Sequence, residues 1–279
     1  MSRKNNDIFN QEQGTLSQNF SESASGTIEW SVPTESIPLP SSGLIYKKGS
    51  FFHNKETVQI KAMTAKEEDI LLSAAYYKSG TVMKELIKSC INNVGVDPDQ
   101  LIPGDKNALI IGIRITGYGT EYPVEVSCSK CGHREEKAFD LSDLEIKRLS
   151  AQPIEVGKNA FSYTLPVSGK EVIFKILNGK EEKARQEEVT NIKLKLGESS
   201  AGLITSILHH AIISIDGVSN SVEIRKFVNS MPARDSKSLR TYMTSIQPGI
   251  DTDVKHTCSN CGSITTVRLP IGGKFFFPD

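Results

Sequence analysis

The residues of this chain best suited to chemistry are two pairs of cysteines, each on a short turn followed by glycine. One turn reads Cys128-Ser-Lys-Cys131-Gly and the other Cys258-Ser-Asn-Cys261-Gly, and together they hold four of the five cysteines. Two such turns supply the four thiolates that a tetrahedral structural zinc takes. We therefore interpret Cys128, Cys131, Cys258 and Cys261 as the metal ligands of one shared site.

The segments beside both turns predict β-hairpins. Residues 122–127 and 134–139 flank the first turn with strand-like sequence, and residues 253–257 and 264–269 flank the second. A cysteine turn at the tip of a hairpin is how zinc ribbons are built. The two hairpins, at about residues 120–140 and 251–270, thus predict one zinc-ribbon-like unit, although a long segment separates them.

Other roles for these cysteines are weaker interpretations. A disulfide or free thiols remain the alternative to zinc, but the hairpin flanks differ from the strand-to-helix turn of a redox C-x-x-C pair. A catalytic zinc needs an open ligand position, which four thiolates do not leave. His133 and His256 could replace a cysteine as ligand. Cys90 belongs to an apolar helical pattern and is interpreted as a buried thiol.

Composition limits the function classes. The chain has 279 residues, 38% of them apolar, and its 33 Lys and Arg residues equal its 33 Asp and Glu residues. This balance argues against broad electrostatic binding to nucleic acid or to an anionic membrane. The absence of a long apolar stretch and of a signal-like N-terminus predicts a protein that is neither exported nor membrane-bound.

The first part of the chain divides by composition. Residues 1–28 are rich in Asn, Gln, Ser and Glu, which predicts disorder in isolation. Residues 29–62 contain prolines that forbid a helix and favour an extended arm. Apolar residues give this arm something to bury, either on its own body or on a partner, and the candidates are Trp30, Leu39 and Leu44.

Residues 63–279 predict a helical body interrupted by hairpins, which is an α+β fold. Thr64 and Glu67 form a capping box that starts a helix, and a second helical pattern runs from Val82 to Cys90. The apolar run over residues 109–115 is compatible with helix or strand. Further predicted elements are a short helix at 141–149, a hairpin over 161–176, and helices at 180–196, 203–215, 221–229 and 236–246.

The C-terminus carries three consecutive aromatic residues, Phe275, Phe276 and Phe277. Each offers about 150–250 Å² of surface, so protein must cover them. The cover is either the chain's own ribbon, which the adjacent ribbon strand favours, or a neighbouring subunit. Common catalytic and phosphate-binding motifs do not occur, which favours a structural or binding role without a small-molecule substrate.

Several segments in order resemble the baseplate hub proteins of T-even-like contractile-tailed bacteriophages. They include Leu39-Pro-Ser-Ser-Gly-Leu-Ile-Tyr, the segment from Met63 to Leu71, the segment from Asp105 to Gly119, and both cysteine turns. Met231-Pro-Ala-Arg-Asp-Ser-Lys-Ser-Leu-Arg and the ending from Leu269 to Asp279 complete the resemblance. It spans about residues 39–279.

The resemblance implies a late viral protein that takes part in building the central hub of a contractile-tail baseplate. Its partners would be other hub or tail proteins, and its place would be the host cytoplasm during assembly or the virion tail. The alternative function is a zinc-ribbon protein that binds nucleic acid or acts in transcription. Against it, Lys130, His133 and Arg134 beside the first turn are offset by Glu135 and Glu136.

Overall fold

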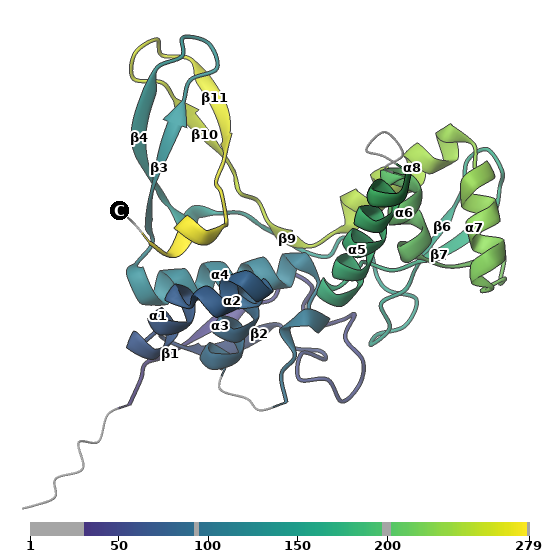
Figure 1. Ribbon diagram of the computed structural model, residues 1–279, viewed down its shortest axis with the longest axis horizontal. Helices are drawn as coiled ribbons and strands as arrows, with labels where there is room; N and C mark the ends of the chain where they lie inside the picture. Colours follow the sequence, from purple (N-terminus) through teal and green to yellow (C-terminus); the bar gives the residue numbers. More distant parts are fainter. Residues whose placement is uncertain (1–30, 92–94, 197–201, 278–279) are drawn as a thin grey trace, which may run out of the picture. The chain divides into compact units, whose positions relative to one another are not determined.

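The computed structural model describes residues 31–91, 95–196 and 202–277. Residues 1–28, which are predicted to be disordered, and Trp30 lie outside this part. Within it, eight α-helices accompany five small antiparallel sheets, four two-stranded and one three-stranded (Figure 1). This mixture confirms the α+β prediction. None of the helices in the described part of the chain combines the length and apolar character of a membrane span.

Helix α4 (Pro103–Tyr118) contains the apolar run for which the sequence allowed helix or strand. Pro103 lies in its first turn, where the missing N–H costs no helical hydrogen bond. Gly112 in this helix permits close packing, because a Cβ there would lie 2.6 Å from the side chain of Ile37. The helix is therefore packed directly against the N-terminal hairpin.

That hairpin consists of β1 (Thr34–Pro38) and β2 (Thr57–Lys61), paired antiparallel. The connection between them places Leu39 and Tyr46 in the core. The buried carboxylate of Asp105, in the first turn of α4, accepts hydrogen bonds from the backbone N–H of Ser41 at 2.9 Å and from the hydroxyl of Tyr46 at 2.5 Å. Burial raises the pKa of Asp105. The segment between β1 and β2 thus packs on the chain's own body.

Three helices follow: α1 (Ala65–Leu72), α2 (Ala74–Ser79) and α3 (Val82–Ile91). The predicted capping box of α1 is confirmed, since Glu67 accepts hydrogen bonds from the Thr64 N–H at 2.9 Å and the Thr64 hydroxyl at 2.6 Å. The Glu67 carboxylate is buried and pairs with Lys61 at 2.8 Å and with Ser89 of α3. One acidic residue therefore joins β2, α1 and α3. Cys90, predicted to be buried, has no exposed surface.

The predicted helix at residues 141–149 is wrong. Leu141–Asp143 forms a single 3-10 turn, in which the Asp140 carboxylate accepts the Ser142 N–H at 2.8 Å. The next residues form strand β5 (Ile146–Lys147), which pairs with β9 (Gly249–Ile250). Pairing with a distant strand has overridden the local helical pattern.

The predicted helix at residues 203–215 is half wrong. Helix α6 (Leu203–Ala211) ends at Ile212, and the rest forms strand β8 (Ile212–Ile215). Its β-branched isoleucines favour a strand, and the open edge of β7 (Glu171–Phe174) supplies the partner.

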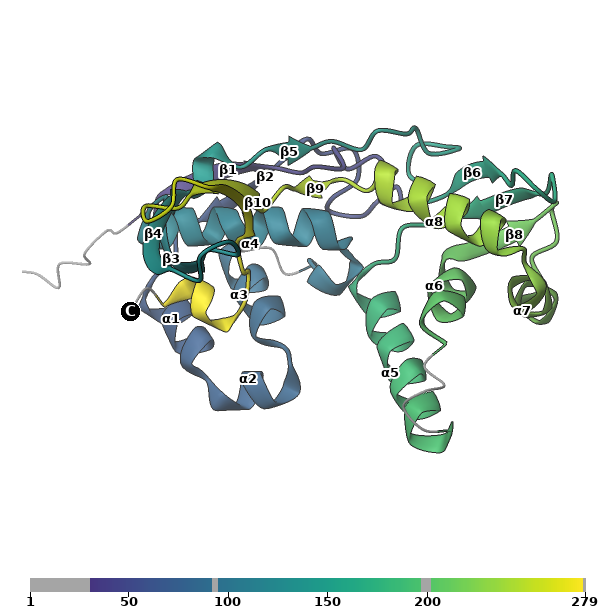
Figure 2. The same cartoon turned by 90° about the horizontal axis from the view of Figure 1, so that it is seen from above.

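The remaining helices lie around that three-stranded sheet, whose third strand is β6 (Phe161–Thr164). Helix α8 (Ala233–Ile246) runs alongside this sheet (Figure 2). Tyr242 of α8 stacks on Tyr163 of β6 at 4.6 Å between ring centroids. The predicted helices at 180–196 and 221–229 correspond to α5 (Gly179–Leu196) and α7 (Ser221–Ser230).

Candidate metal centre

Two hairpins bring the cysteines together. The first pairs β3 (Glu121–Ser127) with β4 (Arg134–Asp140), and the second pairs β10 (Asp253–Thr257) with β11 (Ile264–Arg268). Both hairpins were predicted from the sequence and are confirmed. They lie side by side with their tips together, although they are far apart in the sequence (Figure 1).

The two cysteine turns have the same backbone structure. In the first, the N–H of Gly132 donates to the carbonyl of Cys128 at 2.9 Å, and in the second Gly262 donates to Cys258 at 3.0 Å. Both glycines have positive φ, +72° and +65°, a conformation that other residues rarely adopt. Glycine after each cysteine pair is therefore what allows the turn to close.

The four sulfur atoms form one cluster, all within 4.8 Å of one another. Cys128 Sγ lies 3.8 Å from Cys261 Sγ, and Cys131 Sγ lies 3.7 Å from Cys258 Sγ. Tetrahedral zinc with bonds of about 2.3 Å would hold its sulfurs about 3.8 Å apart. The same separations are far longer than the bond of about 2 Å in a disulfide. The donor set and its spacing therefore fit a tetrahedral metal ion.

The electrostatics of the cluster also favour a cation. Hydrogen bonds lower the pKa of Cys128 to about 5, chiefly the one from the Ser263 hydroxyl and then those from the Cys131 and Lys130 backbone. For Cys258, the hydrogen bond from the Cys261 backbone lowers the pKa, but burial and the neighbouring thiols outweigh it and raise the value to about 11. Four thiolates this close repel one another. A divalent cation would neutralise that repulsion and hold all four in the ionised form.

The surroundings of the cluster join the hairpins further. Glu135 of β4 accepts a hydrogen bond from the Ser259 N–H at 3.0 Å and lies 3.2 Å from Nε2 of the buried His256. His133 contacts Ser259 instead, at 3.3 Å. Among the described residues, the cluster that could hold a metal ion consists of the four cysteines, and neither histidine belongs to it. The structure therefore does not support a histidine ligand in place of one of the cysteines.

Five of the six residues predicted to bind a partner lie in the described structure, and three of them are buried. Leu39, Phe275 and Phe276 belong to its core, with exposed fractions of 0%, 1% and 0%. Leu44 and Phe277 are half-buried, and Trp30 is outside the described residues. The C-terminal aromatic segment therefore packs on the chain itself, and binding of a partner through these residues stays a prediction.

Arg114 positions this C-terminal segment, and the sequence analysis missed it. Arg114 is 1% exposed, and its guanidinium donates to the carbonyl oxygens of Phe275 at 3.0 Å, Gly119 at 3.0 Å and Glu121 at 3.1 Å. The ring of Phe275 meets that of Tyr122 edge to face at 4.9 Å. A single arginine inside an otherwise apolar isoleucine run was the signal that could have revealed it. Ser263, beside two thiols, also went unnoticed, although it follows its turn as His133 follows the other.

The fold and the site define a mixed α+β protein in which two hairpins, distant in the sequence, meet at a cluster of four thiols. The chain belongs to the T4 bacteriophage base plate protein family, which matches residues 45–277. No curated protein and no solved structure matches it. Membership confirms the resemblance to phage baseplate proteins and gives the chain a structural role in the baseplate of a phage tail, among other tail proteins.

Proposed function

We propose that this protein is a noncatalytic component of the central hub of a contractile-tail baseplate, as a subunit or as an assembly factor. Its family membership over residues 45–277 carries the proposal. The segments from Leu39 onward resemble hub proteins. This resemblance narrows the proposed role from the baseplate in general to its hub. No step of this role requires a catalytic group or a small-molecule substrate.

We further propose that the four cysteines bind one structural zinc. Cys128 and Cys261 are 133 positions apart in the sequence, so a zinc ion would cross-link the middle of the chain to its C-terminal part. Zinc supplies only tetrahedral coordination here. The protein's own contribution is the pair of matched turns, the Ser263 hydroxyl and the contacts of Glu135.

The domain organisation that fits this role has three parts. Residues 1–28 form a polar N-terminal segment, residues 29–62 form the arm, and residues 63–279 form the body with the zinc ribbon at about 120–140 and 251–270. The buried contacts of Leu39 and Tyr46 support an arm that belongs structurally to the body.

Tagging the protein in infected cells tests the hub assignment. We expect it to copurify with hub intermediates, and its presence or absence in finished tails decides between a subunit and an assembly factor. If it copurifies with neither, the hub role is excluded. Salt-dependent binding of DNA or RNA by the purified protein would instead support the nucleic-acid alternative.

A further inference from the structure

A groove of about 650 Å³ lies away from the cysteine cluster, between helices α2 and α3 on one side and α5 on the other. Its wall also includes the start of α4 and the segment after β11. Most of its lining is apolar, and the exposed fraction of Tyr77 at its edge is 46%. The principal apolar lining residues are Tyr77, Val82, Met83, Leu101, Ile110 and Ile271.

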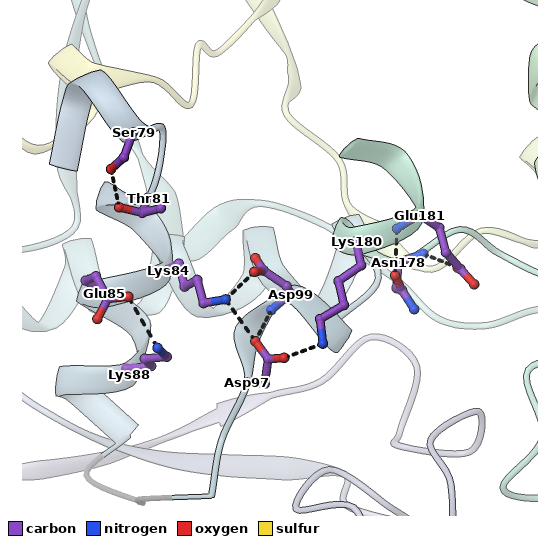
Figure 3. Close-up of polar contacts among 10 residues, drawn as sticks. All are labelled: Ser79, Thr81, Lys84, Glu85, Lys88, Asp97, Asp99, Asn178, Lys180 and Glu181. Atoms are coloured by element: carbon purple, nitrogen blue, oxygen red, sulfur yellow. Dashed lines mark hydrogen bonds and ion pairs between the residues drawn. The ribbon is translucent and has the colours of Figure 1, made fainter. Parts of the chain in front are cut away.

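Ion pairs fix the two sides of this groove relative to each other. Lys84 of α3 pairs with Asp97 at 3.2 Å and also with Asp99, both at the 3-10 turn η1 (Pro98–Gln100) (Figure 3). Asp97 in turn accepts Lys180 of α5 at 2.7 Å. The turn η1 therefore joins α3 to α5.

The start of α5 is fixed as well. The Asn178 N–H donates to the Glu181 carboxylate at 2.9 Å, and the Glu181 N–H donates to the Asn178 side chain at 3.0 Å, which is a reciprocal helix cap (Figure 3). Gly179 donates to the carbonyl of Leu101 at 3.0 Å. The groove is thus preformed, and a ligand would spend little free energy in ordering it.

The charges along the groove are unbalanced. Its two carboxylates are already paired, Asp99 with Lys84 and Glu182 with Arg185 at 2.8 Å. Its two lysines, half-buried Lys106 and exposed Lys183, make no ion pair with any residue that the structure describes. The charge available to a ligand is therefore positive, beside an apolar lining.

We propose that this groove binds a segment of another tail protein, which inserts an apolar side chain beside Tyr77 and places carboxylates against Lys106 and Lys183. The identification of the partner as a tail protein rests on the function proposed above. Charge complementarity identifies its chemistry, and tyrosine is enriched at protein-binding surfaces. The apolar lining favours a protein segment over a nucleic acid, whose backbone would use only the lysines.

Charge reversal of both lysines tests the proposal on the full-length protein. The other baseplate proteins of the same phage, each purified and immobilised, serve as probes. We expect one of them to bind the unmodified protein, and to bind Lys106→Glu/Lys183→Glu at least about tenfold more weakly. Tyr77→Ser should also weaken binding. Lys66→Glu/Lys237→Glu, at two exposed lysines without ion pairs in the described structure, is the matched control and should bind normally.

The outcomes test the docking proposal and the hub role separately. Unchanged melting temperatures show that the variants fold. If the charge-reversed protein binds its probe as well as the control does, the groove is not the docking surface, whereas copurification with hub intermediates would still support the hub role. If Lys106→Glu/Lys183→Glu instead abolishes self-association or binding of a DNA oligonucleotide, the assignment to a tail-protein segment is overturned.

Discussion

Glu67 illustrates how a buried carboxylate can stabilise several elements at once. Burial by itself raises its pKa, but hydrogen bonds from Lys61, Ser89 and Thr64 outweigh burial and lower the pKa from 4.5 to about 2. Because the folded value lies below the ordinary one, the ionised carboxylate stabilises the fold. Its contribution is present above pH 4.5 and is lost as the pH falls toward 2.

We predict that Glu67→Gln lowers the free energy of unfolding by about 3 kcal/mol at pH 7. The variant should also show a smaller loss of stability between pH 4.5 and 2 than the unmodified protein, as measured by denaturant unfolding across that range. Asp69→Asn, at an exposed position of the same helix, is the control and should change the stability little. Equal effects of the two substitutions would contradict the role given to Glu67.

Substitution of Cys258 tests whether the two cysteine turns share one metal ion. We predict one zinc per chain in the purified protein and a large loss of zinc in Cys258→Ser, because three thiolates would remain. Elemental analysis measures both. Cys90→Ser should keep its zinc, since Cys90 is buried away from the cluster and burial raises its pKa to about 12. An unchanged zinc content in Cys258→Ser would refute the shared site.

The residues of the candidate site were partly predictable. All four thiols of the cluster were found, because spacing and a following glycine identify each turn locally. Ser263 and Arg114 were not found, because their importance arises from contacts with Cys128 and Phe275, which lie more than a hundred positions away.

The C-terminal segment provides a prediction at the scale of a structural element. Phe276 is fully buried against the body, whereas Phe277, next to it, is half-buried. We expect Phe276→Ala to cost about 3–5 kcal/mol of stability in the isolated protein and Phe277→Ala to cost less. Thermal unfolding of the purified variants measures the difference.

Deletion of residues 274–279 extends this test to assembly. The truncated protein should melt earlier even without a partner, because it loses the buried aromatic rings. A truncated protein that melts normally and fails only in hub assembly would show that the segment acts by docking on a partner instead.

Elements with local signals were predicted well, and elements formed by distant pairing were not. The α1 capping box and both cysteine hairpins are specified by neighbouring residues. Strand β5, by contrast, exists because Ile146 pairs with Ile250, and β8 exists because Ser214 pairs with Ile173. A sequence pattern does not reveal such partners, so the local apolar spacing indicated helix in both places.

At the scale of the whole molecule, metal removal should affect the ribbon first. We predict that a strong chelator lowers the melting temperature and opens the ribbon to trypsin at Lys130 in the first turn and at Lys255 in strand β10, since forming the site contributes to folding free energy. Helices α1, α3 and α4 lie at the end of the hairpins opposite to the cysteine turns (Figure 1), so most of the helical circular dichroism should persist below the new melting temperature. Cys258→Ser should show no further change with the chelator, and an equal response from that variant would exclude metal as the cause.

The large separation between the paired cysteine turns has a consequence for synthesis. Cys131 precedes Cys258 by more than a hundred residues, so at about 5–20 residues per second the ribosome needs roughly 6–25 s to supply the second half of the site. Until then the first hairpin holds two thiols and no complete ligand set. A chain that stops before Cys258 never completes it. The proposed zinc site would thereby restrict metal retention to finished chains, and incomplete chains would lack the cross-link before they could enter a growing tail.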